Sequence, residues 1–250
     1  SLAVYVFFFL RLPPLTPGIR LMPLWRVFMK CFFKNSIAAL IWTSGIGPFL
    51  RFLRESRLVA IAYHRLSDVP HPLAIHPRMF AAQIMYLKKR GYQSVLIRDI
   101  TAADKNKKAA VYFDDGFRDL PAINILATFF LTTDYLDQKN GNDYLTWQEA
   151  VSLKDRGEIG SHSVTHRKLT KIPLAEARQE MTQSKQLLEE RLGVPITSFS
   201  YPKGRSSQEL EMLAREVGYT LTTADKRFRK VRPDPGESLA VFKLKLLGIL

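Results

Sequence analysis

AVYFDDGFRD, residues 110–119, is a short apolar run that stops on two adjacent carboxylates and a glycine. Successive side chains of a β-strand point to opposite faces, so Asp114 and Asp115 cannot both serve one site from within a regular strand. If the strand ends there, Gly116 can adopt a backbone conformation closed to other residues, and the two carboxylates can converge. Two like charges held close in a partly dry cleft are costly unless a cation or a shared proton compensates for them. The stretch therefore predicts a metal site at the end of a buried strand.

Strand-like and helix-like segments alternate in the chain after Arg57. The expected strands cover residues 58–63, 92–97, 109–113, 127–131, 196–200 and 219–223, and residues 158–161 run directly into His162. The expected helices cover residues 77–90, 147–156, 174–192 and 208–217. Strands that alternate with helices at this spacing favour a mainly parallel α/β sheet or barrel.

The chain has 250 residues, which is enough to bury a substantial core. Its apolar content is that of an ordinary globular protein, which argues against a disordered chain. Cys31 is the only cysteine, so the sequence contains neither an intramolecular disulfide nor a cysteine-rich zinc module. Any metal site must therefore use histidine and carboxylate ligands.

The formal net charge of +14 predicts anionic partners, and its distribution narrows the choice. Residues 1–57 carry eight basic residues and one acidic residue, Glu55, so half of the excess charge lies in the first quarter of the chain. Basic and aromatic residues mixed along an apolar segment favour a membrane interface over a nucleic-acid groove. No nucleic-acid-binding module is recognisable, and we expect no nucleic-acid partner.

The N-terminal segment, residues 1–57, allows two interpretations. Residues 2–10 are strongly apolar but fall well short of the roughly 20 residues that span a bilayer. The pattern allows amphipathic helices over residues 25–33 and 36–54, interrupted by Gly45, Gly47 and Pro48. The segment is either a helical pad that covers one end of a domain formed by residues 58–250, or an interfacial membrane anchor.

The second chemical motif is His162-Ser163-Val164-Thr165-His166. Its histidines are four residues apart, so one helical turn would place both imidazoles on the same side. Neutral imidazole suits zinc and related divalent ions, and a catalytic zinc commonly has three protein ligands and an open position for water. These two histidines and one carboxylate of the Asp-Asp-Gly stretch would supply the three protein ligands.

The third motif, FSYPKG at residues 199–204, also follows an expected strand. Proline and glycine fix a tight loop, which can present backbone N–H groups to a developing oxyanion. Taken alone, this motif is indistinguishable from an ordinary turn.

In this order, the three motifs resemble those of the NodB-like polysaccharide deacetylases, carbohydrate esterase family four. That family has Thr-Phe-Asp-Asp-Gly where this chain has residues 112–116, and its His-Ser/Thr-x-x-His motif is met in full by residues 162–166. One branch has Phe-Ala-Tyr-Pro-Tyr-Gly, close to residues 199–204, and also a Tyr-His-Arg segment, found here at residues 63–65. The resemblance spans residues 58–250.

The resemblance implies a deformed (β/α) barrel, with the N-terminal apolar and basic extension added to it. It also implies a metal site, usually zinc, with Asp115, His162 and His166 as ligands. Asp114 would then be the general base that takes a proton from a metal-bound water, which attacks the acetamide carbon of an N-acetylated sugar.

The third loop is expected to serve the same reaction. By the resemblance, the backbone N–H of Lys203 would stabilise the oxyanion, and Tyr201, Pro202 and Gly204 would contact the substrate. The implied substrate is an N-acetylated polysaccharide or a lipid-linked sugar, without a code for which one. Such a substrate favours the bacterial cell envelope or a membrane-peripheral location over the free cytoplasm.

Three departures from the family pattern leave an alternative open. No histidine follows His166, so the family's late general acid is missing, and His64 is the candidate proton donor in its place. Residues 241–246, where the penultimate strand is expected, show neither the family's Asp nor its Arg. Only ten residues, 117–126, stand where relatives fit a helix and a turn. The alternative is a catalytically impaired, glycan-binding pseudoenzyme of the same fold.

Overall fold

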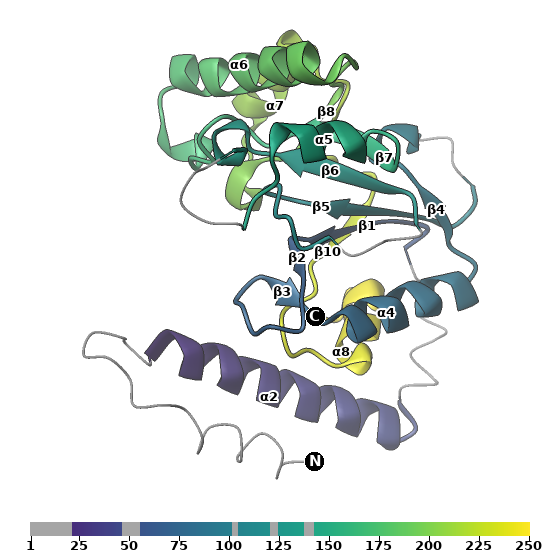
Figure 1. Ribbon diagram of the computed structural model, residues 1–250. Coiled ribbons are helices and arrows are strands. Elements are labelled where there is room, and N and C mark those ends of the chain that lie inside the picture. The colour runs from purple at the N-terminus through teal and green to yellow at the C-terminus, as the bar shows by residue number, and fades with distance from the viewer. Residues whose placement is uncertain (1–21, 47–55, 102–104, 121–124, 138–142) are drawn as a thin grey trace.

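A curled sheet of parallel strands forms the body of the computed structural model (Figure 1), which describes residues 22–46, 56–101, 105–120, 125–137 and 143–250. Eight described strands make up this sheet: β1 (Leu58–Tyr63), β4 (Gln93–Val95), β5 (Lys108–Phe113), β6 (Ala127–Leu131), β7 (Gly157–Ser161), β8 (Ser198–Phe199), β9 (Leu221–Thr222) and β10 (Arg229–Val231). Their order is β10-β1-β5-β6-β7-β8-β9, and β4 pairs with the first half of β5. The expectation of a deformed α/β barrel is confirmed.

The two faces of the sheet carry different sets of side chains because residues alternate along each strand. The outer face, with Val59, Ile61, Val111 and Phe113, packs against the helices in the main core. The inner face, the concave side of the sheet, carries Ala60, Ala62, Ala110, Tyr112 and Phe130 in a separate cluster. The small alanines of β1 and β5 leave room on the inner face, which is where the cavity of the protein lies.

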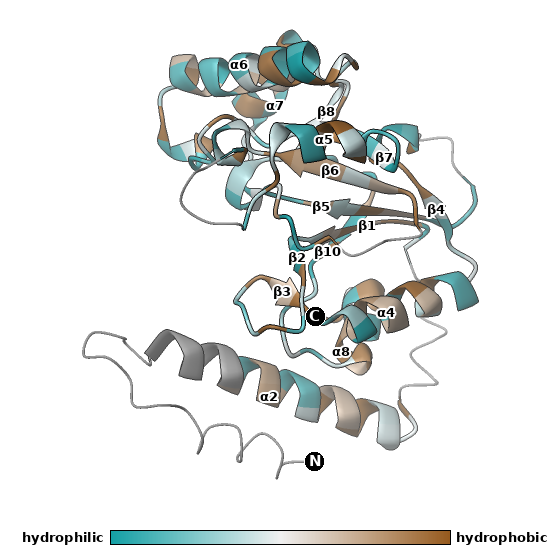
Figure 2. Ribbon diagram, viewed as in Figure 1, coloured by the Kyte–Doolittle hydropathy of each residue, from teal (hydrophilic) through white to brown (hydrophobic). Residues whose placement is uncertain are grey.

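Six described α-helices surround the sheet: α2 (Met22–Thr43), α4 (Pro77–Lys89), α5 (Trp147–Leu153), α6 (Leu174–Leu192), α7 (Gln208–Glu216) and α8 (Leu239–Leu247). A capping box between Thr146 and Glu149 begins α5, and Gly193 in the left-handed conformation ends α6. Figure 2 shows alternating hydrophilic and hydrophobic turns on α6, as expected of a helix that buries one face. The expected range of α6 is confirmed.

Two sequence-based expectations about the ends of the chain are wrong. The break expected between residues 33 and 36 is absent, because neither glycine nor proline interrupts Phe33–Ser36 and α2 continues through it. The helix ends at Thr43, just before the interruption expected at Gly45. Residues 241–246 lie in helix α8 and not in a strand, because Ser238 caps its start and Gly248 ends it. The other N-terminal expectations fall on residues 1–21 and 47–55, outside the described residues.

Helix α2 docks on α8 and the preceding loop mainly through polar contacts. The Lys34 ammonium lies 3.2 Å from Asp234 and 3.0 Å from Glu237, and Lys245 of α8 lies 2.6 Å from the same Glu237. The Asn35 side chain donates to the Gly236 carbonyl and accepts from an adjacent backbone N–H. Ala38 adds a small apolar contact with α8. Polar groups therefore hold this helix against the domain.

The opposite side of α2 is apolar and open to solvent. Phe33, Ile37 and Leu40 are 57%, 52% and 68% exposed, and they lie four and three residues apart along one stripe. A surface helix usually buries its apolar stripe and exposes its polar one, so the polarity of α2 is inverted relative to the domain. Among the described helices, none is both long enough and apolar enough to cross a membrane. We call Phe33, Ile37 and Leu40 the α2 stripe.

The docking of α2 predicts that Glu237 stabilises the fold. Glu237→Gln should lower the free energy of unfolding by about 1–3 kcal/mol, because the fully buried carboxylate pairs with both Lys34 and Lys245. Urea unfolding followed by circular dichroism measures the change. The matched control, Glu190→Gln on the exposed side of α6, should stay within about 0.5 kcal/mol of the wild type. Equal stabilities of the two variants would contradict the assigned role.

Candidate active site

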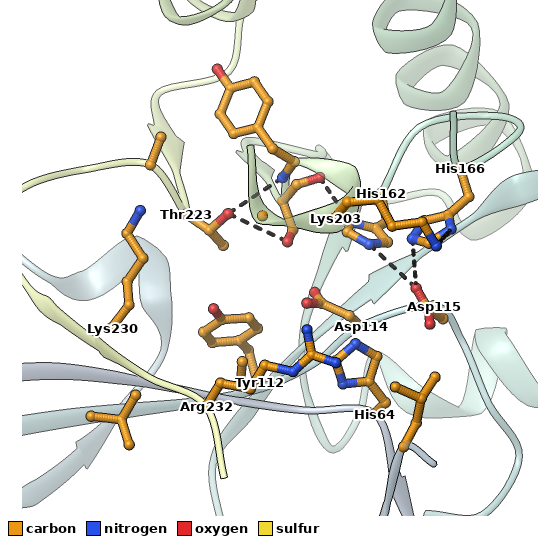
Figure 3. A pocket seen from close by; sticks show the side chains of 17 residues that line it. His64, Tyr112, Asp114, Asp115, His162, His166, Lys203, Thr223, Lys230 and Arg232 are labelled. Carbon is orange, nitrogen blue, oxygen red and sulfur yellow. Dashed lines mark hydrogen bonds and ion pairs between the residues drawn. The ribbon is translucent and has the colours of Figure 1, made fainter. Parts of the chain in front are cut away.

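The motif residues meet at the carboxyl ends of neighbouring parallel strands (Figure 3). His64 follows β1, Asp114 and Asp115 follow β5, His162 follows β7, and the third loop follows β8. Together they line a cavity of about 230 Å³. Ligand sites at this edge are typical of parallel α/β folds because the strand-to-helix loops gather there.

The two carboxylates diverge from strand geometry in the way that the sequence predicts. The backbone N–H of Asp114 still bonds to the Tyr63 carbonyl at 2.9 Å, so the β5 ladder continues to this residue. Asp115 and Gly116 then adopt positive φ angles of 76° and 86°. A Cβ atom on Gly116 would lie 3.3 Å from a methyl group of Leu131, so space as well as backbone conformation favours glycine here.

The segment His162–His166 is not the helical turn expected from the spacing of its histidines. Ser163 and His166 have positive φ angles of 69° and 60°, and the Ser163 hydroxyl accepts the His166 N–H at 3.1 Å. The result is a tight irregular loop that still brings both imidazoles together, with ring centroids 4.9 Å apart.

Glu180 of α6 holds this loop, and sequence reasoning missed it. Its carboxylate accepts the backbone N–H groups of Val164 and Thr165, each at 2.9 Å, and also the Thr165 hydroxyl. The carboxylate is buried, and these contacts satisfy it while fixing two residues between the histidines. In a long amphipathic helix, the sequence pattern predicts that a glutamate at this position is solvent-exposed, so only the fold reveals its role.

The side chains of Asp115, His162 and His166 fit a divalent metal ion. The Asp115 Oδ1 atom lies 3.3 Å from His162 Nε2 and 3.0 Å from His166 Nε2, and each residue offers a ligand atom within 4.8 Å of the other two. This Oδ1 is buried and makes no hydrogen bond within the described structure. His162 Nδ1–H donates to the Ser200 carbonyl at 2.8 Å, which leaves Nε2 as a lone-pair donor facing Asp115. Two nitrogens and one oxygen are a typical donor set for zinc.

Electrostatics keep the carboxylate of this group ionised. Burial raises the pKa of Asp115, but contact with His162 and His166 outweighs it and holds that pKa well below its usual range. Burial lowers the pKa of His162, yet the nearby Asp114 and Asp115 carboxylates raise it overall. A cation is therefore favoured at the point where these side chains converge.

Asp114 lies beside this group with a buried, unsatisfied oxygen. It is 9% exposed, and its Oδ1 atom has no hydrogen-bond partner among the described residues. His64 lies nearby in the same cavity (Figure 3). Burial lowers the pKa of His64 and outweighs the opposing effect of Asp114 and Asp115, so the neutral imidazole dominates at pH 7. An acid role for His64 therefore requires that it gain a proton during the reaction.

The third loop places its residues differently. Lys203 and Gly204 line the cavity, and Lys203 has a positive φ of 60°. Tyr201 also borders the cavity, but its phenol is buried and donates to the Leu210 carbonyl at 3.1 Å, away from the site. Pro202 is buried and is not among the lining residues.

Sequence reasoning also missed Lys230 and Arg232, which line the same cavity from β10 and the residue after it. Figure 3 shows the Arg232 guanidinium close to His64 and Asp114. Because β10 has three residues, its hydrophobic pattern is too short to predict a strand. The available signal is the run Arg229–Arg232, in which basic residues two apart would share one face.

The described residues of the short stretch 117–126, which follows the Asp-Asp-Gly motif, form a loop. Residues 117–120 contain no helix, and residues 121–124 lie outside the described part of the chain. Phe117 stacks on Tyr144 with ring centroids 4.7 Å apart, and Asp119 pairs with Arg65. Side-chain packing and an ion pair thus hold the segment next to Gly116.

Several solved structures, two of them named as deacetylases, share this architecture. A de-N-acetylase from Aggregatibacter actinomycetemcomitans aligns with a TM-score of 0.62 at 18% identity, covering 75% of this chain and 98% of that one. The deacetylase PplD of Streptococcus pyogenes aligns at 0.59 and 19% identity, over 71% and 91% of the two chains. IcaB from Ammonifex degensii aligns at 0.59 and 23% identity, over 66% and 82%. The fold is therefore that of the carbohydrate deacetylases.

Sequence comparison agrees with the fold. Residues 101–222 match the family model described as polysaccharide deacetylase. The peptidoglycan-N-acetylglucosamine deacetylase PgdA of Listeria monocytogenes is 24% identical over 179 residues, which cover 66% of this chain and 36% of the relative. The chain thus carries a polysaccharide deacetylase domain of the NodB-like kind, and it spans about a third of the length of this curated relative.

The contacts of Glu180 predict that it governs metal affinity. Glu180→Gln should weaken Zn²⁺ binding about 10- to 100-fold, because an amide cannot accept all three donors of the His162–His166 loop. Competition with a chromophoric chelator measures the affinity. Glu190→Gln, on the exposed side of the same helix, serves as the control and should bind as the wild type does. Wild-type affinity in Glu180→Gln would remove this residue from the site.

Proposed function

We propose that this domain is a metal-dependent hydrolase that removes N-acetyl groups from an N-acetylglucosamine-containing polysaccharide or glycoconjugate. The observation that carries the proposal is the convergence of Asp115, His162 and His166 beside the buried, unsatisfied Asp114 in one cavity. Membership in the polysaccharide deacetylase family supports the reaction type.

Asp115, His162 and His166 would hold the metal, with zinc favoured by the donor set. When bound, such an ion supplies an activated water and polarises the acetyl carbonyl. The residues of the chain orient it: the Ser200 carbonyl fixes the His162 ring, and Glu180 fixes the loop between the histidines.

Asp114 is the proposed general base. Asp114 lines the cavity next to the metal ligands, and its Oδ1 atom has no hydrogen-bond partner among the described residues, so its carboxylate can accept a proton from the attacking water. The backbone N–H of Lys203, on the opposite wall, is the proposed oxyanion donor. His64 is the proposed proton donor to the departing amine. Because its imidazole is neutral at pH 7, it would first receive the proton that Asp114 took from the water.

These roles predict opposite behaviour for two substitutions. Asp114→Asn should retain Zn²⁺ while acetate release from an N-acetylglucosamine oligosaccharide falls about 10²–10⁴-fold, because the amide cannot take the proton. His166→Ala should lose metal occupancy, because one of three ligands is removed. Metal analysis and an acetate assay on the same samples test both. Activity of the wild-type level in Asp114→Asn would exclude Asp114 as the base, and unchanged metal content in His166→Ala would exclude His166 as a ligand.

The alternative is a glycan-binding pseudoenzyme of the same fold. It is favoured by the short stretch after Gly116 and by the absence of a histidine after His166. A metal-loaded protein that binds the oligosaccharide without releasing acetate would identify it. Acetate release that depends on the added metal would exclude it.

Residues 1–57, the basic and apolar extension, are proposed to contact a membrane surface. The α2 stripe is exposed, and the described part of α2 contains no acidic residue. The extension also carries a net charge of +7, which would attract anionic lipid headgroups. The Listeria relative is named as a deacetylase of peptidoglycan. That name and the positive charge of the extension both support a cell-envelope or membrane-peripheral location for this protein.

The membrane proposal predicts a lipid-dependent effect of the α2 stripe. Phe33→Ser with Leu40→Ser should weaken binding to phosphatidylglycerol-containing vesicles at least about tenfold, because two exposed apolar side chains no longer enter the interface. Co-sedimentation measures the binding, with Leu174→Ser and Met212→Ser, two exposed apolar residues of α6 and α7, as the control. A dimer that dissociates in the α2 variant, without vesicle binding in either protein, would assign the stripe to a second copy of the chain instead.

A further inference from the structure

Two basic side chains point from β10 into the cavity. In the register of the sheet, Lys230 pairs with Ala60 of β1, and Arg229 and Val231 pair with Val59 and Ile61. Paired residues on neighbouring strands point to the same side, so Lys230 shares the inner face with Ala60. Arg232, two residues further on, follows the same alternation. The alanines of β1 are too small to fill the space in front of these cations.

The cavity brings a third cation near them. Lys230 and Arg232 line one wall, and Lys203 lines the wall that follows β8 (Figure 3). The Lys203 ammonium also lies 3.2 Å from His166 Nδ1, so this third cation borders the histidine loop as well as the cavity. Asp114 and Asp115, the carboxylates of the cavity, lie at the proposed metal site and would be offset by the ion. A surplus of positive charge remains on the walls.

Lys230 and Arg232 are solvent-exposed at the mouth of the cavity, and they lack the counterions that several other cations of the domain have. Lys34 and Lys245 share Asp234 and Glu237, and Lys185 pairs with Glu189. By contrast, neither Lys230 nor Arg232 forms an ion pair with any acidic residue in the described part of the chain.

The acidic residues nearest to Lys230 do not take this role. Burial lowers the pKa of the Lys230 ammonium, and the charges of Glu211 and Asp225 offset that effect only in part. Asp225 is already paired with Arg227 at 2.6 Å. Lys230 thus lines the cavity with no ion-pair partner among the described residues, so its ammonium is available to an incoming anion.

A general property of edge strands does not explain this placement. Lysine and arginine on a sheet edge often protect it from pairing with another chain. Arg229 fits that role, since it points to the outer face and its Nε donates to the Ser56 hydroxyl at 2.7 Å. Lys230 and Arg232 instead point into the cavity, so protection of the edge does not require their charge there.

We propose that Lys230 and Arg232, with Lys203 opposite, form a binding site for an anionic group, carboxylate or phosphate, of the glycan that enters the cavity. This inference rests on the proposed deacetylase function, because it names the substrate class of the same site. The acetamide group is neutral and requires none of these three cations. The substrate is therefore an acidic N-acetylated glycan, and a neutral homopolymer would leave the cations unused.

A binding experiment tests the inference independently of turnover. The probe is an oligosaccharide of alternating N-acetylglucosamine and N-acetylmuramic acid with free carboxylates, and its methyl ester is the neutral match. Calorimetry on the zinc-loaded protein should give a Kd about tenfold lower for the acid than for the ester, the value of one charge-assisted hydrogen bond. Raising the salt concentration should shrink the difference. Equal Kd values for acid and ester would overturn the carboxylate form of the site.

A phosphate-bearing N-acetylglucosamine oligosaccharide, compared with its unphosphorylated form, separates the two anions. A preference for the phosphorylated probe alone would assign the site to phosphate. Equal binding within both pairs of probes would overturn the inference.

Substitutions locate the effect. Lys230→Gln and Arg232→Gln should each reduce the ratio of ester to acid Kd toward one. Lys226→Gln, an exposed lysine of the loop before β10 that does not line the cavity, should leave the ratio unchanged. A ratio that survives both cavity substitutions would overturn the assignment.

Acetate release is measured separately on the same probes. No acetate from any probe, with the acid still bound more tightly, would reject the deacetylase function and keep the anion site. Acetate from acid and ester alike, at equal Kd, would keep the function and reject the anion site.

Discussion

The backbone reversal at Asp115 and Gly116 is the constraint on which the site depends. The β5 ladder continues through the N–H of Asp114, and the chain then enters the left-handed region for two residues. Without that reversal the two carboxylates would point to opposite faces of the sheet. With it, one carboxylate meets the histidines while the other stays free at the cavity wall. The positive φ of Gly116 and the close approach of the Leu131 side chain both disfavour any larger residue at this position.

A second set of contacts holds the loop that carries His162 and His166 in place. His162 and His166 stand on an irregular loop with strained backbone angles, which could not keep one shape by itself. Glu180 ties that loop to α6, and the Ser200 carbonyl ties His162 to β8. The proposed ligands thus rely on supports that come from the outer layer of the fold.

The sequence predicted the strands and helices that have long, regular patterns and failed where the decisive contacts are distant. Residues 127–131 and 174–192 were predicted with their observed bounds, because burial and capping are encoded locally. The spacing of His162 and His166 was read as a helix, although the loop shape depends on Glu180, more than ten residues away. Arg232 escaped prediction because its strand is too short for a pattern, and α8 was mistaken for a strand region because most of its residues are apolar.

The position of the cations at the border of the sheet has an evolutionary consequence. Asp115, His162 and Ser200 directly follow interior strands, where a change disturbs neighbours on both sides. Lys230 lies in the edge strand β10, and Arg232 follows it; β1 is the only paired neighbour of this strand among the described residues. Changes at the border can therefore accumulate without loss of the inner machinery. A combinatorial library at the exposed positions 230 and 232 would explore new glycans at little risk to folding, and natural diversification of this architecture has the same route open to it.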